Sequence, residues 1–348
     1  MRVWMTPQKT VFALILIGAV LFPIFTTSPY LVHVAILILI WSFMVTVWSY
    51  MGRFGIVSLC HGAFMGIGAY TAFLLFNFFR CSPWIGMGIG VLLSSILAGM
   101  IGYGCFRFGV IGHYFAITTL VIGELVMLVI IAFRGITGGR LGLTLNSIGT
   151  APFFRQFLSL QFGSKLVYYY FALILLLISM YIWKKIDQSK IQVALKAIGD
   201  DEVAAASIGI NIVKYKTSVT ILSAAFATIG GVIYGQYISY FDPVSMVGSA
   251  ASLSICFKAI LGGMFTPWGP TIGTILIVSL EEYIRVRYGT TFIGYSNIAY
   301  AIIIIALIIF LPNGLYGSLS DFFGKKKKSH AAAKTIVRVE NERKALTF

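Results

Sequence analysis

The amino-acid sequence predicts an all-α polytopic membrane protein with about ten transmembrane helices. Hydrophobic residues make up 59% of the 348 residues, charged residues make up only 11%, and the mean hydropathy is +0.92. A soluble domain carries about 25% charged residues. The charges also gather in short segments between long apolar ones, which is typical of a chain that crosses a bilayer repeatedly. This composition excludes a soluble enzyme and a soluble nucleic-acid-binding domain.

Ten apolar segments follow one another along the chain. Most have the ~17–25 residues that a helix needs to cross the hydrocarbon core. The first follows Arg2 and Lys9, as a signal peptide would, but no small-residue cleavage site comes after Phe25. We therefore interpret it as a retained transmembrane helix. The segments are 10–26, 30–50, 56–79, 84–106, 112–133, 168–183, 216–239, 245–263, 267–287 and 293–312.

The distribution of Lys and Arg predicts the orientation. With ten crossings both termini lie on one side, where the segments hold 18 Lys and Arg residues against 7 on the opposite side. Basic residues are enriched in cytoplasmic loops, so we expect cytoplasmic termini and an external loop 134–167. The net charge of +15 then reflects topology and contact with anionic membrane lipid, and we expect no nucleic-acid partner. The basic tail 319–348 is expected to lie at the membrane surface or to be disordered.

Two groups of four apolar segments, 30–133 and 216–312, share features. The second segment of each group is rich in Gly, Ser and Ala, at 55–70 and at 248–263. The first group begins outside and the second inside, so the sequence predicts two inverted four-helix repeats. Such repeats with glycine-interrupted segments are typical of transporters with a pathway at the repeat interface, although small residues also simply permit close helix packing. The third segments open with the same dipeptide, Pro83–Trp84 and Pro267–Trp268.

A polar segment, 194–215, separates the two groups. Asp200, Asp201 and Glu202 precede a run of small residues, and Gly209 closes that run. Acidic side chains cap the N-terminal end of a helix, and glycine accepts the left-handed conformation that ends one. We therefore predict an isolated cytoplasmic helix of about two turns, roughly 12 Å long.

This predicted helix has small residues and no catalytic side chains, which suits docking into a groove of another protein. We expect Ala204 and Ala205 to lie against the partner, because small side chains allow close approach of the backbone. The sequence has no GxxxxGK[ST] phosphate-binding loop, so ATP hydrolysis must belong to a separate subunit. We expect no catalytic residues, cofactor or metal, since the four cysteines lie in or beside apolar segments without ligand spacing.

Four polar residues in the apolar segments are candidates for a translocation pathway: Ser58, His61, Glu124 and Lys258. Glu124 lies near mid-membrane, where an ionisable group is a functional candidate, or it locks two helices as a protonated or Ser/Thr-bonded side chain. Lys258 either extends to the cytoplasmic interface or contacts a solute carboxylate or Glu124. His61, beside Ser58, is either a hydrogen-bonded interior residue or a gate or ligand.

Several sequence blocks occur together in the order found in one family of membrane proteins. Over about residues 30–318 the chain resembles the membrane permease subunit of a bacterial ABC importer for branched-chain amino acids. The blocks are GIVSLCHGAFMGIGAYTA (55–72), YFAITTLVIGELVML (114–128), TGG (137–139), ALKAIGDDEVAAASIGINIVKYK (194–216), AILGGMFTPWGPTIGTIL (259–276) and FLPNGLYG (310–317).

The resemblance implies partners and a location. The segment 194–215 corresponds to the loop that, in such importers, fits a cleft on the cytoplasmic ATPase subunits. A second permease subunit, an extracytoplasmic solute-binding protein and the bacterial inner membrane are implied as well. The chain departs from the family pattern: Val203 stands where the loop motif has an acid, Cys60 replaces a glycine, and Met127 stands where a basic residue is common.

We divide the chain accordingly. The segment 1–29 holds the first helix, 30–318 is the permease domain and 319–348 is the tail. Branched-chain or other aliphatic amino acids are the leading solutes, ahead of urea or short amides and of sugars. A stand-alone secondary transporter is the alternative of another class; it needs no docking helix, and a proton-coupled one needs more than one mid-membrane acid. The permease domain comprises repeat one (30–133), an outer loop and linking helix (134–193), the coupling loop (194–215) and repeat two (216–312).

Overall fold

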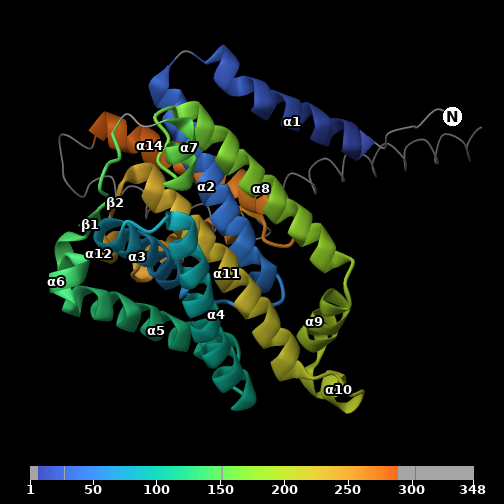
Figure 1. The fold of residues 1–348 in the computed structure, drawn as a ribbon. Coiled ribbons are helices and arrows are strands. Elements are labelled where there is room, and N and C mark those ends of the chain that lie inside the picture. Colours follow the sequence, from blue (N-terminus) through green and yellow to red (C-terminus); the bar gives the residue numbers. More distant parts are fainter. Residues whose placement is uncertain (1–6, 27, 150–151, 289–301, 303–348) are drawn as a thin grey trace, which may run out of the picture.

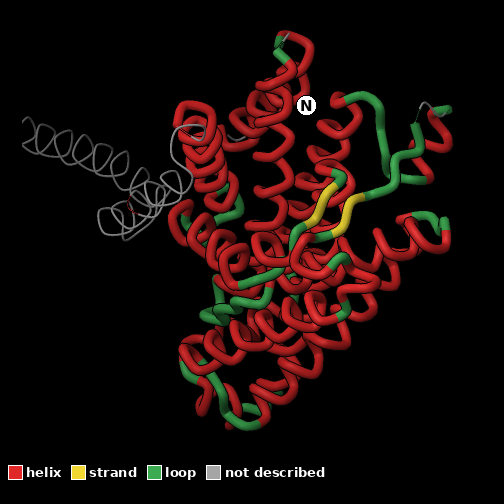
Figure 2. The backbone as a smooth tube through the Cα atoms, turned by 90° about the vertical axis from the view of Figure 1, so that its left-hand side faces the viewer, coloured by secondary structure: helices red, strands yellow, loops and turns green. Residues whose placement is uncertain are grey.

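A computed structural model describes residues 7–26, 28–149, 152–288 and 302 of the chain. Within these residues almost all regular structure is helical, and long helices pack side by side in a bundle (Figures 1 and 2). The apolar segment expected at 293–312 and the basic tail 319–348 lie outside the described residues.

Seven helical segments in the described part are long and apolar enough to cross a membrane. The protein is therefore an all-α polytopic membrane protein, as predicted, whereas the total of ten helices stays a prediction. The seven segments are α2 (Pro29–Gly52), α3 (His61–Phe79), α4 (Pro83–Arg107), α5 (Gly112–Ala132), α8 (Lys165–Asp187), α11 (Ile212–Ile238) and the pair α12–α13 (Pro243–Met246 and Ser249–Gly262).

Two further helices cover expected spans without meeting the same standard. Helix α1 (Pro7–Phe25) contributes the shorter apolar stretch Leu16–Phe25. Helix α14 (Gly269–Tyr288) carries four charged residues in its second half. They are Glu281, Glu282, Arg285 and Arg287.

Helices α2 and α11 lie at the centre of the bundle. Helix α11 packs against α2, α3 and α4, and α2 packs against α8, α13 and α14. Glycine allows the closest of these approaches: a side chain at Gly231 of α11 would collide with the backbone of Met65 in α3. Because lipid offers no hydrophobic driving force between helices, such close packing supplies much of their association.

Two predicted spans are interrupted. Residues 53–60 are not helical, so the span expected to begin at 56 becomes a helix only at His61. The span expected at 245–263 is broken at Val247 and Gly248, between α12 and α13. In both cases an extended or turned segment lies beside the start of a long helix.

A short connection region follows α5. It contains α6 (Arg134–Thr137), a 3₁₀ turn η1 (Gly139–Leu141), β1 (Leu143–Thr144) and α7 (Phe153–Leu158). Strand β1 pairs antiparallel with β2 (Tyr240–Phe241), which follows α11. This two-stranded ribbon was not predicted, and it ties the loop after α5 to the end of α11.

Candidate functional sites

A short capped helix is present where the sequence predicts one, but it is not isolated, because it is the second of two consecutive helices. Helix α9 spans Lys190–Asp200 and α10 spans Glu202–Ser207. The Asp201 carboxylate accepts hydrogen bonds from the N–H groups of Val203 (2.8 Å) and Ala204 (3.0 Å). Gly209 has φ +87°, the left-handed conformation expected after a helix end. We call α9 and α10 together the coupling segment.

The three neighbouring acids have different roles, although we expected all of them to cap one helix. Asp200 is the last residue of α9, and only Asp201 caps α10. The Glu202 carboxylate instead accepts a hydrogen bond from the ammonium group of Lys216, on α11.

Our expectation that Ala205 lies against the partner is wrong. Ala205 is 2% exposed and packs into the hydrophobic core of the protein itself. Elsewhere on α10 the side chains of Val203 (80%) and Ala204 are exposed, and so is Ile208 (75%), the residue that follows the helix. Large apolar side chains exposed on a polar segment are the signal that the sequence reasoning missed.

The carboxylate of Glu124, on α5, lies at the N-terminal end of α13, the helix that follows the break at Val247 and Gly248. It accepts a 2.7 Å hydrogen bond from the N–H group of Ser249, the first residue of α13. The N-cap residue of α13 is Gly248, which has no side chain to cap the helix, so Glu124 of α5 supplies the acceptor. A carboxylate at a helix N-terminus is stabilised by the helix dipole. Glu124 thus joins α5 to α13, through the backbone N–H of Ser249 and not through a Ser or Thr hydroxyl.

The N-terminal ends of α3 and α13, which follow the two interruptions, contact each other. The N–H group of Gly62, in the first turn of α3, donates to the Ser252 hydroxyl of α13 at 2.9 Å. A Cβ atom at Gly62 would lie 2.7 Å from the carbonyl oxygen of Val247, so only glycine fits. Helix α5 touches both breaks, because its Thr119 hydroxyl accepts from the N–H group of Leu59 at 3.0 Å.

His61 and Ser58 are interior residues. The His61 ring is fully buried, and its Nε2 lies 2.8 Å from the Ser223 hydroxyl, which donates to the carbonyl oxygen of Val47. This arrangement confirms the hydrogen-bonded interior alternative for His61. Ser58 is also buried, and its carbonyl oxygen accepts from the Trp48 indole at 2.8 Å.

Lys258 does not extend to an interface, so that expectation is wrong. Its side chain is 1% exposed, and its ammonium nitrogen lies 2.9 Å from the Ser254 hydroxyl and 3.3 Å from the Glu281 carboxylate. It also lies 4.4 Å from the centroid of the Trp41 ring, a cation–π distance. The carboxylate that Lys258 contacts is therefore Glu281 of α14, and not Glu124.

Comparisons with known proteins agree with this architecture. Residues 13–312 match the family model described as the permease component of the branched-chain amino acid transport system. The chain belongs to this family. No solved structure matches it significantly.

Named relatives come from bacteria and archaea. The high-affinity branched-chain amino acid transport system permease LivM of Escherichia coli is 27% identical over 326 residues, covering 88% of this chain and 75% of the relative. A probable branched-chain amino acid transport permease, LivH, of Methanocaldococcus jannaschii is 26% identical, covering 75% and 82%. A nucleoside ABC transporter permease, NupC, of Lactococcus lactis is 26% identical over only 29% of this chain.

Proposed function

We propose that this protein is the translocation subunit of an ATP-driven importer for branched-chain or other aliphatic amino acids. The observation that carries the proposal is the family match over residues 13–312, which spans nearly the whole described bundle. The chain sits in the bacterial inner membrane with cytoplasmic termini. It works with cytoplasmic ATPase subunits, a second permease subunit and an extracytoplasmic solute-binding protein, and it does not itself hydrolyse ATP.

The coupling segment is the docking site for the ATPase. The exposed side chains of Val203, Ala204 and Ile208 give α10 an apolar face outside the apolar spans. Asp201 and Gly209 fix the two ends of this short helix, so the face is presented in one orientation. A preformed face binds with less loss of conformational freedom than a flexible loop does.

The two predicted inverted repeats, 30–133 and 216–312, organise the bundle. The packing pattern supports this proposal: α4 of the first group packs on α11 of the second, while α14 of the second packs on α2 of the first. Likewise α3 packs on α4, and α13 packs on α14. Helices α3 and α13, which begin after the two interruptions, contact each other at the interface between the groups.

The translocation pathway runs along the side of this contact that faces α5. Glu124 is partly exposed there, and an acid within a span is favourable only where it faces protein or water. We assign Glu124 to the wall of the pathway. Ser58, His61 and Lys258, which are buried, act behind it by fixing the positions of the helices.

A secondary transporter remains the competing class, and the Lys258–Glu281 pair argues against its proton-coupled form. Glu281 is a second acid within the predicted spans, but its charge is matched by a fully buried lysine. Removing the Glu281 charge would leave that buried lysine without its partner, which is costly.

Reconstitution tests the assignment. The chain, its second permease and the two ATPases are purified together and placed in liposomes with the binding protein. We expect uptake of leucine, isoleucine or valine that requires both ATP and the binding protein. Uptake of urea or acetamide alone would change the solute class. Uptake by this chain without ATPases, driven by an ion gradient, would overturn the proposal.

A further inference from the structure

We propose that two ion pairs, Arg53–Asp187 and Lys216–Glu202, transmit movement of the coupling segment to the two central helices, α2 and α11. The four side chains are positioning residues for transport, and they contact neither solute nor ATP. This inference rests on the proposed function, since it assumes that an ATPase docks on α10.

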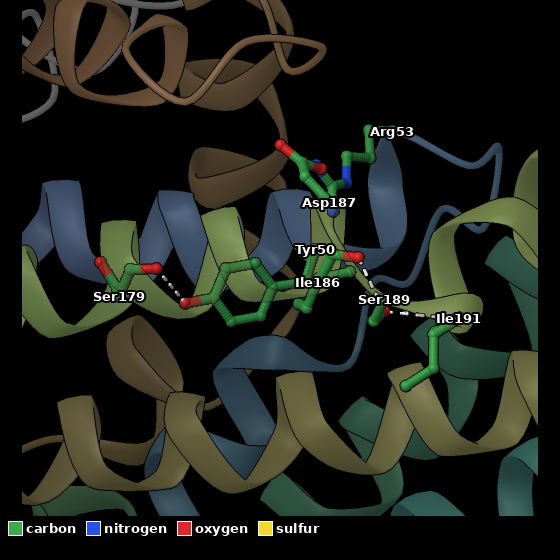
Figure 3. Close-up of polar contacts among 7 residues, drawn as sticks. All are labelled: Tyr50, Arg53, Ser179, Ile186, Asp187, Ser189 and Ile191. Carbon is green, nitrogen blue, oxygen red and sulfur yellow. Dashed lines mark hydrogen bonds and ion pairs between the residues drawn. The ribbon is translucent and has the colours of Figure 1, made fainter.

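The first ion pair joins the end of α2 to the elbow between α8 and α9 (Figure 3). The guanidinium group of Arg53, the residue after α2, donates a 2.6 Å hydrogen bond to the Asp187 carboxylate at the end of α8. The guanidinium carbon lies 4.2 Å from the Trp183 ring centroid and 4.7 Å from that of Phe54. The Arg53 side chain is 7% exposed, so it has little room to change its orientation.

Neighbouring contacts make this connection stiff. The Tyr50 hydroxyl, one turn before Arg53, donates a 2.7 Å hydrogen bond to the carbonyl oxygen of Ser179 in α8. Beyond Asp187, the Ser189 hydroxyl donates to the carbonyl oxygen of Ile186 and accepts from the N–H group of Ile191, the second residue of α9. The last turns of α2 therefore connect through α8 to the first turn of α9 (Figure 3).

The second ion pair joins α10 to α11 and α4. Glu202 is the first residue of α10, and its carboxylate binds the ammonium group of Lys216, in the second turn of α11. The Lys216 side chain is 8% exposed, and its ammonium lies 5.5 Å from the ring centroid of Phe106 in α4. A shift of Glu202 therefore acts on Lys216, whose side chain has little room to change its conformation.

A cavity beside these residues explains why the ion pairs matter. A space of about 320 Å³ separates the turn between α9 and α10 from the loop at Phe54–Ile56 and from the start of α5. The coupling segment also packs into the hydrophobic core through buried apolar residues such as Leu195 and Ala205. Apolar contacts have little directionality, whereas charge-assisted hydrogen bonds are directional and strong. The ion pairs are therefore the connections that set the direction of movement.

The two connections reach different halves of the bundle. Arg53 directly follows α2, the first helix of the first predicted repeat, and Lys216 lies in the second turn of α11, the first helix of the second. Helices α2 and α11 pack on each other, and α2 is lined with buried apolar residues along most of its length. A single rigid displacement of α9 and α10 is thereby delivered to both predicted repeats at the same end of the molecule.

The test separates coupling from stability. We reconstitute the complete importer with Arg53→Gln or Lys216→Gln, and measure ATP hydrolysis and solute uptake in the same liposomes. Arg107→Gln and Lys214→Gln, which remove exposed charges from the same end of α4 and α11, are the matched controls. We expect uptake per ATP hydrolysed to fall at least about fivefold, the smallest effect that a typical coupling free energy produces. The number of ATPase subunits bound to each complex should stay the same.

Charge exchange provides the decisive variant. Lys216→Glu combined with Glu202→Lys restores the ion pair in reverse, so it should recover uptake per ATP relative to either single change. Where Arg53→Gln fails to fold, Asp187→Asn breaks the same pair from its more exposed side, 35% exposed. An unchanged ratio of uptake to ATP hydrolysis, with the ATPase bound, would overturn the inference. If wild-type protein binds no ATPase, it is the proposed function that fails.

Discussion

Two ionisable residues of the predicted spans have different environments. Glu124 accepts a backbone N–H at the start of α13 and is partly exposed. Lys258 is enclosed between a carboxylate, a hydroxyl and an indole ring. The first can change partners without leaving a buried charge unpaired, whereas the second cannot. We therefore expect Glu124 to matter for transport and Lys258 for stability.

Glu124→Gln should preserve assembly and reduce uptake. The glutamine carbonyl can still accept the Ser249 N–H, while the negative charge is removed. We expect normal amounts of assembled complex and a loss of uptake of about tenfold, equivalent to 1.4 kcal/mol in a rate or equilibrium. Glu124→Ala, which also removes the acceptor, should lower the unfolding temperature. Wild-type uptake by the glutamine variant would reduce Glu124 to a helix lock.

Lys258→Met should destabilise the protein. It leaves Glu281 without its cation, and losing one partner of a buried pair costs about 3–5 kcal/mol, an upper bound here because Glu281 is 29% exposed. The double variant Lys258→Met with Glu281→Gln removes both charges and should recover most of the loss. Unfolding of the detergent-solubilised protein, followed for both single variants and the double variant, checks this. Additive losses would show that the pair is not coupled.

At the scale of elements, the sequence predicted where helices form better than which side of a helix faces the bundle. Ten apolar segments and a capped polar helix follow from hydropathy and from Asp201 and Gly209, which are local signals. The side of α10 that faces the bundle depends on α9 and α11, so Ala205 was placed on the wrong side. The interruption at Val247 also depends on a distant element, because it fits against Gly62 of α3.

Changing the exposed face of α10 should weaken ATPase binding without affecting the fold. Val203→Asp or Ile208→Asp replaces an exposed apolar side chain that we expect to be buried in the ATPase cleft. A charge buried without a partner is unfavourable, so we expect at least about tenfold less ATPase in pull-down, or 1.4 kcal/mol. Lys214→Asp, an exposed change on neighbouring α11, is the control. Equal ATPase recovery from all three variants would mean that α10 docks by another face.

At the scale of the whole molecule, class and family were predictable, and the pairing of charges was not. Low charge content and repeated apolar segments establish a polytopic membrane protein, because a water-soluble fold could not bury so many apolar residues. The pair Lys258–Glu281 joins residues on different helices, and Arg53–Asp187 joins residues far apart in the chain. These pairs depend on the packing of α13 with α14 and of α2 with α8, which hydropathy does not specify.

Cysteine labelling should establish the orientation. In a background where partly exposed Cys81 is replaced by serine, Ser147→Cys lies in the connection region after α5 and Ser207→Cys lies at the end of α10; both positions are exposed. A membrane-impermeant maleimide added to intact cells should label the first and spare the second until the membrane is opened. The opposite pattern would contradict cytoplasmic termini and would place the coupling segment outside the cell.

The enclosed lysine of α13 also constrains how the protein is made. A lysine at the centre of an inserting helix costs about 2.5–3.5 kcal/mol, and α13 has only 14 residues with which to offset it. Its counter-charge, Glu281, is synthesised later, on the next helix. We therefore expect α13 to remain beside the insertion machinery until α14 emerges, so that the two helices enter the bilayer together with the Lys258 charge already paired.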